Sequence, residues 1–428
     1  MPSFTTSFVT MEQHSLNIAI IGGGLGGLSA AIALRQVGHN VTVYERDHTR
    51  YELGSGIGVV SNATKWLEGE WGVDFGLAKA LVCERAQIHD WKTGKILADV
   101  GTGDFKSRFG HNYYMCYRAD LHKALLRKAL AAPDNLNVSV QHVFLKQDHR
   151  CVAANAEEAT CTFSNGVTIK ANLIVGADGI HSQIRRSIGI TPEANPSTSC
   201  CYRFIIRRSN LESLQLTDLC NKPVISIWGG QGIDKVVWGP AHDFGLLTGF
   251  AFFPAERAPL CEDGWDIPAS PADLANTFPG IDPILRDVML VAEDVKIWRL
   301  FEHQPYPYRQ KGKACLIGDA AAPMMPDQNQ GFSMAVEDAA ALSLVLSQEM
   351  LRRLKGNLSK ALDLYEELRR DRVRIVQEKS LKARTDVRER FGFATPQDPP
   401  GKLTAEWLCE YDMRKHLEEL LAGGEKQQ

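Results

Sequence analysis

Several features that would assign this sequence to a common class of protein are missing. Its ten cysteines form no C-x-x-C pair, and the adjacent Cys200 and Cys201 cannot form an unstrained disulfide with each other. No stretch reaches the roughly 18 consecutive apolar residues of a membrane-spanning helix. The first 15 residues also lack the basic start and apolar core of a secretory signal. We therefore expect free thiols, a cytoplasmic protein and a flexible arm at residues 1–15.

The sequence also lacks a large excess of charge of either sign. The formal net charge is only −3, from 48 basic and 51 acidic residues, and no dense basic block lies outside the helical C-terminal third. Nucleic acids and anionic membranes need such a block as an electrostatic footprint, so neither is an expected partner. The twelve histidines show no H-E-x-x-H arrangement and the cysteines lack zinc spacing, so no metal site is expected. We expect a monomer or homodimer whose ligands are small molecules.

What the sequence does contain begins with a βαβ unit. The apolar run 18–21 has the length of a buried strand, and it leads through a glycine-rich turn into the helix-forming segment 28–35. Residues 41–44 follow as a second, β-branched strand that finishes at Glu45. Such a unit is the start of a parallel sheet with a Rossmann-like nucleotide-binding topology.

Later segments extend this domain and interrupt it. Residues 172–175 and 314–317 are two more buried-strand candidates, each ending in a Gly/Asp turn. Between them, short β-branched and aromatic runs separated by Gly, Pro and Asp are typical of an antiparallel sheet. The predicted fold class is α/β, divided into a flexible arm at 1–15, a first nucleotide-binding part at 16–194, an inserted mainly antiparallel substrate sheet at 195–300, a second nucleotide-binding part at 301–350 and a helical C-terminal region at 351–428.

The helical C-terminal region carries a cluster of arginines beside an apolar stripe. We interpret the cluster as a solvated helix face rather than as a site for an anionic partner. Its members are Arg369, Arg370, Arg372 and Arg374.

The glycines of the first turn have the spacing of a dinucleotide fingerprint. Gly22, Gly24 and Gly27 stand between strand and helix, where they permit a tight turn and let backbone N–H groups approach a pyrophosphate. Glu45 ends the next strand, where an acidic side chain accepts hydrogen bonds from ribose hydroxyls. The pattern favours an unphosphorylated ribose, and it does not separate NAD from FAD.

Two further segments decide between them. They are GADGIHSQIR (176–185) and LIGDAAAPMMPDQNQGFSMAVEDA (316–339). At these residues the chain closely resembles the flavoprotein aromatic hydroxylases, the family of salicylate and p-hydroxybenzoate hydroxylases and many fungal secondary-metabolite monooxygenases. The resemblance implies FAD as the bound cofactor. It places Asp178 and Gly179 where FAD and NAD(P)H both pass, and Asp319 at the flavin ribityl chain.

Other matches surround the same cofactor. The resemblance implies that Arg118, in Tyr-Arg-Ala-Asp-Leu, lies along the FAD, and that the Gly-Ser-Gly-Ile-Gly segment ending at Gly58 is a loop near the flavin. Residues 326–331 are expected to form a loop that ends at Gly331. Phe332 then opens a helix whose N-terminal N–H groups and dipole face the flavin pyrimidine.

The chain departs from the family pattern at two positions. Ala322 stands where many relatives have histidine after Gly-Asp-Ala-Ala, and Asn329 stands where the Gly-Gln-Gly loop usually begins. Asparagine tolerates a left-handed backbone better than most residues, so we expect the loop to keep its conformation.

The resemblance implies that NADH or NADPH reduces the flavin and that O2 adds to give a C4a-hydroperoxide. The distal oxygen then passes to a small, electron-rich aromatic substrate, phenolic or polyketide-like. Arg203 matches a Tyr-Arg pair that faces the substrate in several relatives, and we nominate it as a substrate-orienting cation, beside the alternative that it only bridges two domains. Four aromatic residues are either walls of the substrate pocket or plain core: Tyr202, Trp228, Trp238 and Phe252.

Two alternatives remain open. One is a decarboxylating hydroxylase of a salicylate-like acid, and the other, from a different class, is a non-catalytic dinucleotide-binding protein. A pyridine-nucleotide disulfide reductase is excluded, because the chain has neither a redox cysteine pair nor a second dinucleotide fingerprint. The Trp-x-Trp-x-Ile-Pro motif of flavin halogenases is represented only by a fragment at residues 265–268.

Overall fold

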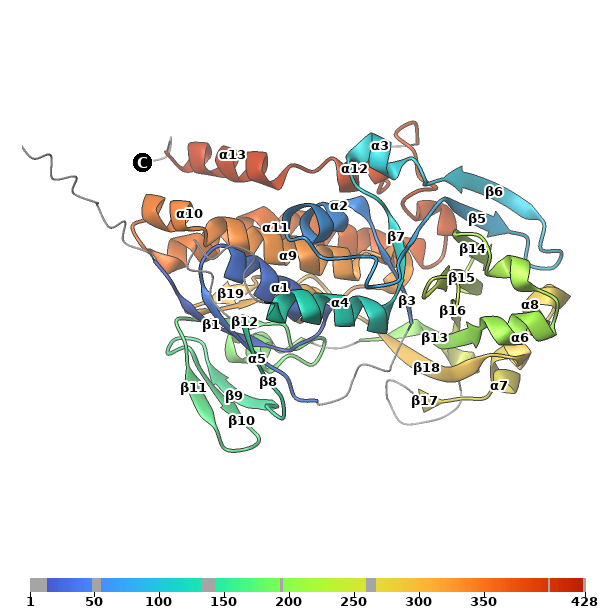
Figure 1. Cartoon of the computed structure of the whole chain (residues 1–428), viewed down its shortest axis with the longest axis horizontal. Helices are drawn as coiled ribbons and strands as arrows, with labels where there is room; N and C mark the ends of the chain where they lie inside the picture. Colours follow the sequence, from blue (N-terminus) through green and yellow to red (C-terminus); the bar gives the residue numbers. More distant parts are fainter. Residues whose placement is uncertain are drawn as a thin grey trace, which may run out of the picture.

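The computed structural model describes residues 14–47, 55–131, 143–192, 195–258, 267–398 and 401–425. A six-stranded sheet and an eight-stranded sheet lie toward opposite ends of the molecule, with the helices α9 and α11 running along the first of them (Figure 1). Residues 1–13 of the expected arm and residues 265–266 of the 265–268 fragment lie outside the described ranges. Within those ranges, no helix combines the length and apolar content needed to cross a membrane.

The six-stranded sheet contains every strand predicted for the nucleotide-binding domain. Its order is β19-β20-β12-β1-β2-β8, and β1 (Asn17–Ile21) runs parallel to both β2 (Asn40–Tyr44) and β12 (Leu173–Gly176). β20 (Ala314–Leu316) runs parallel to β12. Because parallel strands share one carboxyl edge, the turns that follow β1, β12 and β20 meet there. The Rossmann-like topology is confirmed.

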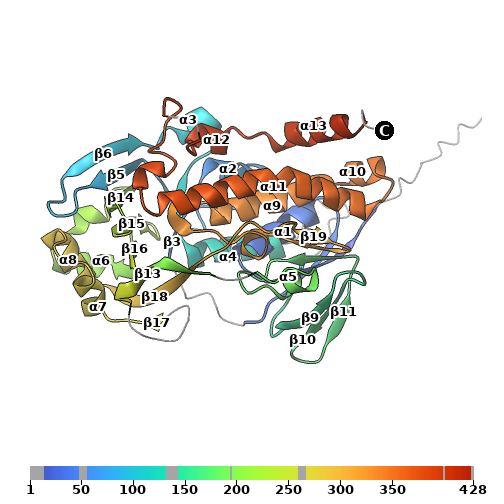
Figure 2. The ribbon, with the colours of Figure 1, turned by 180° about the vertical axis from the view of Figure 1, so that it is seen from behind.

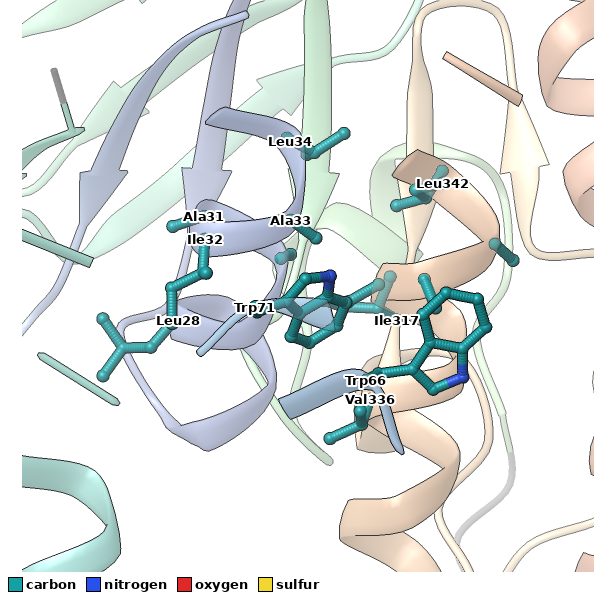
Figure 3. Close-up of a cluster of buried hydrophobic side chains, with 14 of the residues drawn as sticks. Leu28, Ala31, Ile32, Ala33, Leu34, Trp66, Trp71, Ile317, Val336 and Leu342 are labelled. Atoms are coloured by element: carbon teal, nitrogen blue, oxygen red, sulfur yellow. The ribbon is translucent and has the colours of Figure 1, made fainter. Parts of the chain in front are cut away.

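Small and branched apolar side chains form the core between this sheet and its helices. α1 (Leu25–Gln36) buries nearly all of its residues, including Ala30, Ala31 and Ile32, each 0% exposed. Figure 3 shows side chains of α1 in one cluster with Leu342 of α9 (Gly331–Val345). The alanines let the two helices pack closely, which brings the N-terminus of α9 beside the turn that precedes α1.

The antiparallel sheet expected between residues 195 and 300 is present, with the order β17-β18-β13-β16-β15-β14-β5-β6. Its strands are β13 (Asn195–Arg207), β14 (Val224–Gly229), β15 (Lys235–Ala241), β16 (Leu246–Pro254), β17 (Ile267–Pro268) and β18 (Glu293–Glu302). Two strands from before the insertion complete it. β5 (Arg85–His89) pairs in parallel with β14, and β6 (Ile96–Gly101) pairs with β5. Sequence analysis missed these two, because their pairing joins segments far apart in the chain.

The C-terminal region is helical, as expected, but the interpretation of its arginine cluster was partly wrong. α11 (Leu358–Ala383) lies alongside α9 (Figure 2), and Arg369 and Arg372 are only 0% and 6% exposed. Arg370 and Arg374 are the solvated members. The two buried arginines face acidic residues of α9, which charge counting along one helix cannot reveal.

Glu337 is the centre of this buried network. Its Oε2 accepts hydrogen bonds from Arg369 Nη1 and Arg372 Nε, both at 2.7 Å, and its Oε1 accepts from Arg372 Nη2 at 2.8 Å. Asn62 Nδ2, from α2 (Ser61–Thr64), donates to the same Oε1 at 2.8 Å. The hydrogen bonds that the Glu337 carboxylate loses to water on burial are thereby replaced by hydrogen bonds from the protein. This is the condition for keeping such a charge inside a protein.

The neighbouring Asp338 ties the network to the nucleotide-binding edge. Its Oδ1 accepts from Arg369 Nε at 2.8 Å, and its Oδ2 accepts from the backbone N–H of Gly318 at 2.9 Å. Gly318 belongs to the turn that follows β20. The ion pairs therefore fix this turn and the first half of α9 as one unit.

Acidification tests the network. Burial alone raises the pKa of Glu337, but Arg372 and Arg369 outweigh it and lower that pKa to about 2. Because the folded-state pKa lies below the usual value of about 4.3, the carboxylate's stabilisation is complete above that value and is lost as pH falls toward 2. We expect Glu337→Gln to lower the free energy of unfolding by about 3–5 kcal/mol at pH 7, the cost of breaking a buried pair, and to flatten its dependence on pH below about 4.3. Urea unfolding across this pH range measures both.

Asp371→Asn is the matched control, because Asp371 lies on the same helix with its side chain 79% exposed. It is expected to unfold like the wild type. An unchanged pH dependence in Glu337→Gln would contradict the assignment.

Candidate active site

One cavity of about 1150 Å³ lies between the two sheets. This exceeds the roughly 300–1,000 Å³ of a pocket for one drug-sized ligand, so the cavity has room for two ligands. Backbone turns of the six-stranded sheet line one half, and side chains of the eight-stranded sheet line the other. The predicted residues that line it are Gly22, Gly24, Glu45, Gly58, Arg118, Asp178, Gly179, Trp238, Phe252, Asp319, Gly331 and Phe332.

The glycine turn after β1 requires glycine for two different reasons. A Cβ on Gly22, whose φ is +109°, would lie 2.3 Å from the carbonyl oxygen of Ala177, and a Cβ on Gly27 would lie 1.9 Å from that of Gly22. Gly24 is different, because no described atom lies within 4 Å of a Cβ built there. Gly24 caps the N-terminus of α1, where free N–H groups and the helix dipole attract an anion. The turn therefore has the shape and charge that a pyrophosphate needs.

Glu45 lies at the end of β2 beside this turn. Its Oε2 accepts from the N–H of Gly23 at 2.7 Å, and its Oε1 accepts from the N–H of Arg46 at 2.8 Å. Oε1 also accepts from the N–H of Asp47 at 3.1 Å. A carboxylate has about four acceptor sites, so these bonds orient Glu45 and leave it able to accept from a ribose hydroxyl.

Asp178 and Gly179 form the turn after β12. Asp178 accepts from Ser182 Oγ and from the N–H groups of Gln183 (2.7 Å) and Ile184 (3.2 Å), which anchors α5 (Gln183–Ser187). Burial raises the pKa of Asp178 above its usual value, while these hydrogen bonds oppose the rise. Gly179 has φ +76° and no described atom near its missing Cβ, so the cavity reaches its backbone.

Asp319 and Arg118 lie on facing elements of the cavity. Asp319 is in the turn Gly318–Ala320, and Arg118 begins α4 (Arg118–Leu130). Burial raises the pKa of Asp319, and the positive charges of Arg118 and Arg185 act against this rise. Asp120, two residues after Arg118, pairs with His242.

The segment before α9 has the predicted loop character. A 3-10 turn at Pro326–Gln328 is followed by Asn329, whose φ of +52° is left-handed, as expected for this substitution. Asn329 Oδ1 accepts from the N–H of Gly58 at 3.3 Å, and a Cβ on Gly58 would lie 2.1 Å from Asn329 Nδ2. Gly58 lies in the strand β3 (Gly56–Val59), whereas a loop was predicted for residues 54–58. Residue 54 lies outside the described ranges.

The sheet half of the cavity is an apolar wall. Phe252 lines it as proposed. Trp238 is also among the lining residues, but its ring packs with Tyr202 and Trp228 in the core on the sheet's other side, 4.4 Å from the ring of Trp228. Other apolar members of the wall are Ile225, Ile227, Val237, Pro240, Phe250, Trp298, Leu300 and Phe301, joined by Met324 and Met325 from the loop before α9.

Arg203 is not among the lining residues. It is 0% exposed, its Nη1 donates to Asp294 Oδ2 at 2.9 Å, and its guanidinium lies 5.6 Å from the ring centroid of Trp298. Arg203 therefore lies behind the wall and supports Trp298, which does line the cavity.

Three charged residues of the sheet half were missed by sequence analysis: Lys235, Asp327 and Arg390. Lys235 opens an apolar strand, and Asp327 stands within the loop segment that was matched to the family. Their proximity depends on how the sheet docks against the loop, so only an inward-facing lysine in an apolar strand could have suggested it.

Comparison with known proteins identifies the family. A family model described as "FAD binding domain" matches residues 15–380. The chain belongs to this family. It is 31% identical to hispidin-3-hydroxylase of Neonothopanus nambi over 396 residues, covering 86% of this chain and 88% of that protein. It is also 31% identical to 3-amino-4-hydroxybenzoate 2-monooxygenase PtnB3 of Streptomyces platensis over 418 residues, covering 94% and 96%.

A solved salicylate hydroxylase substrate complex has the same fold, with a TM-score of 0.72 and 21% identity over 95% of this chain and 98% of that one. The chain is thus an FAD-dependent aromatic monooxygenase that uses NAD(P)H and O2. The non-catalytic alternative is set aside. The open glycine cradle at Gly24 and the carboxylates that line the cavity fit this cofactor.

A substitution at Gly24 separates cofactor binding from folding. Gly24 has extended backbone angles and empty space at its Cβ, so Gly24→Val fits the protein itself but fills the cradle. We expect an unchanged melting temperature of the apoprotein and at least about a tenfold loss of FAD affinity, or about 1.4 kcal/mol, measured by flavin fluorescence titration.

Gly101→Val is the matched control, since Gly101 also has an open Cβ position but lies on β6, away from the cavity. Full FAD affinity in Gly24→Val would contradict the placement.

Proposed function

We propose that this monooxygenase hydroxylates a small aromatic ring that carries hydroxyl or amino groups. The observation that carries the proposal is the continuity of one cavity from the glycine turn at Gly24 to the aromatic wall at Phe250, Phe252 and Trp298. A dinucleotide and a planar ring therefore fit side by side in a single enclosure.

We assign FAD to the half formed by the turns. Gly24 caps the helix end that faces the pyrophosphate, while Gly22 and Gly27 permit the tight turn that places this end there. Glu45 accepts from the adenosine ribose, and Asp319 with Arg118 lies along the ribityl chain. The backbone of Gly58 and the Asp178-Gly179 turn complete this half. Gly331 and Phe332 present the N-terminus of α9 to the ring, where a helix dipole stabilises negative charge. When bound, FAD supplies hydride acceptance from NAD(P)H and activation of O2.

The sheet half then has two tasks that belong to this chain. Its apolar side chains exclude water from the reacting centre. They also present flat surfaces, such as those of Phe252 and Trp298, against which an aromatic ring can stack. Arg203 acts from behind by fixing Trp298 rather than by contacting the substrate, which modifies the role expected from sequence.

The names of the sequence relatives support the substrate class. One acts on hispidin and another on 3-amino-4-hydroxybenzoate, a ring that carries both an amino and a hydroxyl group. Electron-donating substituents of this kind make a ring reactive toward an electrophilic oxygen. We therefore propose a phenolic or polyketide-like substrate.

The wider setting follows from composition. A net charge of −3 without a dense basic block argues against a nucleic acid or an anionic membrane as partner. The cysteines in the described ranges are free and buried, which suits a reducing compartment. We propose a cytoplasmic monomer or homodimer, with the domain divisions proposed above.

The first test is the visible spectrum of the purified protein, followed by NADH and NADPH oxidation in air. We expect a yellow protein whose oxidation of NAD(P)H is accelerated by hispidin, 3-amino-4-hydroxybenzoate or a related phenol, with a hydroxylated product found by mass spectrometry. Salicylate is included because release of CO2 from it would indicate the decarboxylating alternative. A colourless protein that cannot be reconstituted with FAD would contradict the proposal.

A further inference from the structure

One buried ion pair lies on the wall of the cavity. Lys235 of β15 contacts Asp327 of the Pro326–Gln328 turn, and their side chains are 4% and 0% exposed. Both residues line the cavity. The pair therefore joins the substrate sheet to the loop that leads into α9.

The lysine has its full set of partners. Its ammonium donates to Asp327 Oδ1 and to the backbone carbonyls of Ala383 and Arg384, each at 3.3 Å, and it lies 4.8 Å from the ring centroid of Phe252. An ammonium has three N–H donors, so Lys235 has none left for a ligand. Its role is to balance the charge of the carboxylate and to hold it in place.

The aspartate does not have its full set of partners. Asp327 Oδ2 is buried and has no hydrogen-bond partner among the residues that the structure describes. A buried carboxylate oxygen without a donor is unfavourable, and such atoms in native proteins call for an explanation. Because Asp327 belongs to the cavity lining, an O–H or N–H group of a ligand bound beside it would supply the donor that Oδ2 lacks.

Among the described residues of this wall, no side chain offers a competing base. Phe252, Leu300 and Met325 form an apolar cluster around Cys201. Burial raises the pKa of the Cys201 thiol well above its usual value, and the charge of Asp327 adds to this, so Cys201 stays neutral. The other charged side chain on the described part of this wall is Arg390, a permanent cation.

We propose that Asp327 is the catalytic base that binds and deprotonates the ring hydroxyl of the substrate, with Lys235 as its positioning residue. This inference rests on the proposed function and narrows it to rings that carry an ionisable hydroxyl group.

The proton step is local and reversible. The O–H bond of the ring hydroxyl breaks, its electron pair stays on the oxygen, and the proton bonds to Asp327 Oδ2. The negative charge of the phenolate oxygen raises the electron density at the ring carbons ortho and para to it. These carbons are the positions that receive the oxygen atom. After the hydroxylated carbon has lost its own proton to water and the ring is aromatic again, Asp327 returns its proton to the phenolate oxygen.

A purely structural pair makes different predictions. If Lys235 and Asp327 only hold the sheet to the loop, removing both charges together restores stability and activity alike, because no uncompensated charge is then left buried. If Asp327 is the base, the double substitution restores stability but leaves activity low.

The experiment compares Asp327→Asn, Lys235→Met and the double variant with the wild type, each as the FAD-loaded enzyme. The probe is 3-amino-4-hydroxybenzoate, with hispidin as the second substrate. We expect Asp327→Asn to keep its FAD and its KM within a few-fold and to lose about 10²-fold or more in the kcat of product formation. Its residual activity should rise with pH toward the phenol pKa of about 10, because solvent then ionises the substrate. The double variant should have a higher melting temperature than Lys235→Met, with kcat still low.

Glu302→Gln is the matched control. Glu302 of β18 pairs with Arg384, the residue that follows α11. It therefore joins the eight-stranded sheet to the end of α11, as Lys235 does through the carbonyls of Ala383 and Arg384, but it does not line the cavity. It is expected to keep the wild-type kcat.

The outcomes separate this inference from the proposed function. An active wild type whose Asp327→Asn variant hydroxylates at the wild-type rate, or a double variant that regains both stability and activity, overturns the role of Asp327 alone. A wild type whose NAD(P)H oxidation responds to no ring hydroxyl compound overturns the proposed function itself.

Discussion

The site depends on a few charges buried between two helices. Glu337 and Asp338 of α9 share Arg369 and Arg372 of α11, and Asp338 also holds the backbone of Gly318. Charges removed from water are costly unless every polar atom regains a partner, so this set tolerates essentially one geometry. That geometry sets where α9 begins relative to the turn after β20. The helix N-terminus and the turn carrying Asp319 are thus held in register without any contribution from a ligand.

The cavity divides according to the chemistry of its walls. On the nucleotide side the recognition elements are backbone N–H groups at turns, and glycines matter there because main chain must approach main chain. On the sheet side the elements are side chains, and nearly all of them are apolar. A charged pair at the junction of the two sides is therefore conspicuous. In a low-dielectric setting one carboxylate has far more influence on a bound ring than it would have in water.

Local patterns predicted the nucleotide-binding half well. The strands at 17–21, 40–44, 173–176 and 314–316 are short apolar runs bounded by turn residues, and such information is contained within a few consecutive positions. The conformation of Asn329 followed from its own side chain. What failed was non-local. The burial of Arg369 depends on a different helix, and the joining of β5 to β14 depends on a segment well over a hundred residues away.

The same limit applied to the site. Residues in turns at the carboxyl edge of a parallel sheet could be expected to converge, and they do line one cavity. Depth within the inserted sheet could not be predicted in this way: Arg203 shares a sheet face with Phe250 but lies beneath Trp298.

The parallel pairing of β5 with β14 also bears on how such enzymes can be recombined. The substrate sheet cannot be exchanged as one continuous segment of sequence, because its outer strands β5 and β6 belong to the first part of the nucleotide-binding domain. A chimera that exchanges only residues 195–302 would join a foreign β14 to the resident β5, and would leave a mismatched sheet edge open to aggregation.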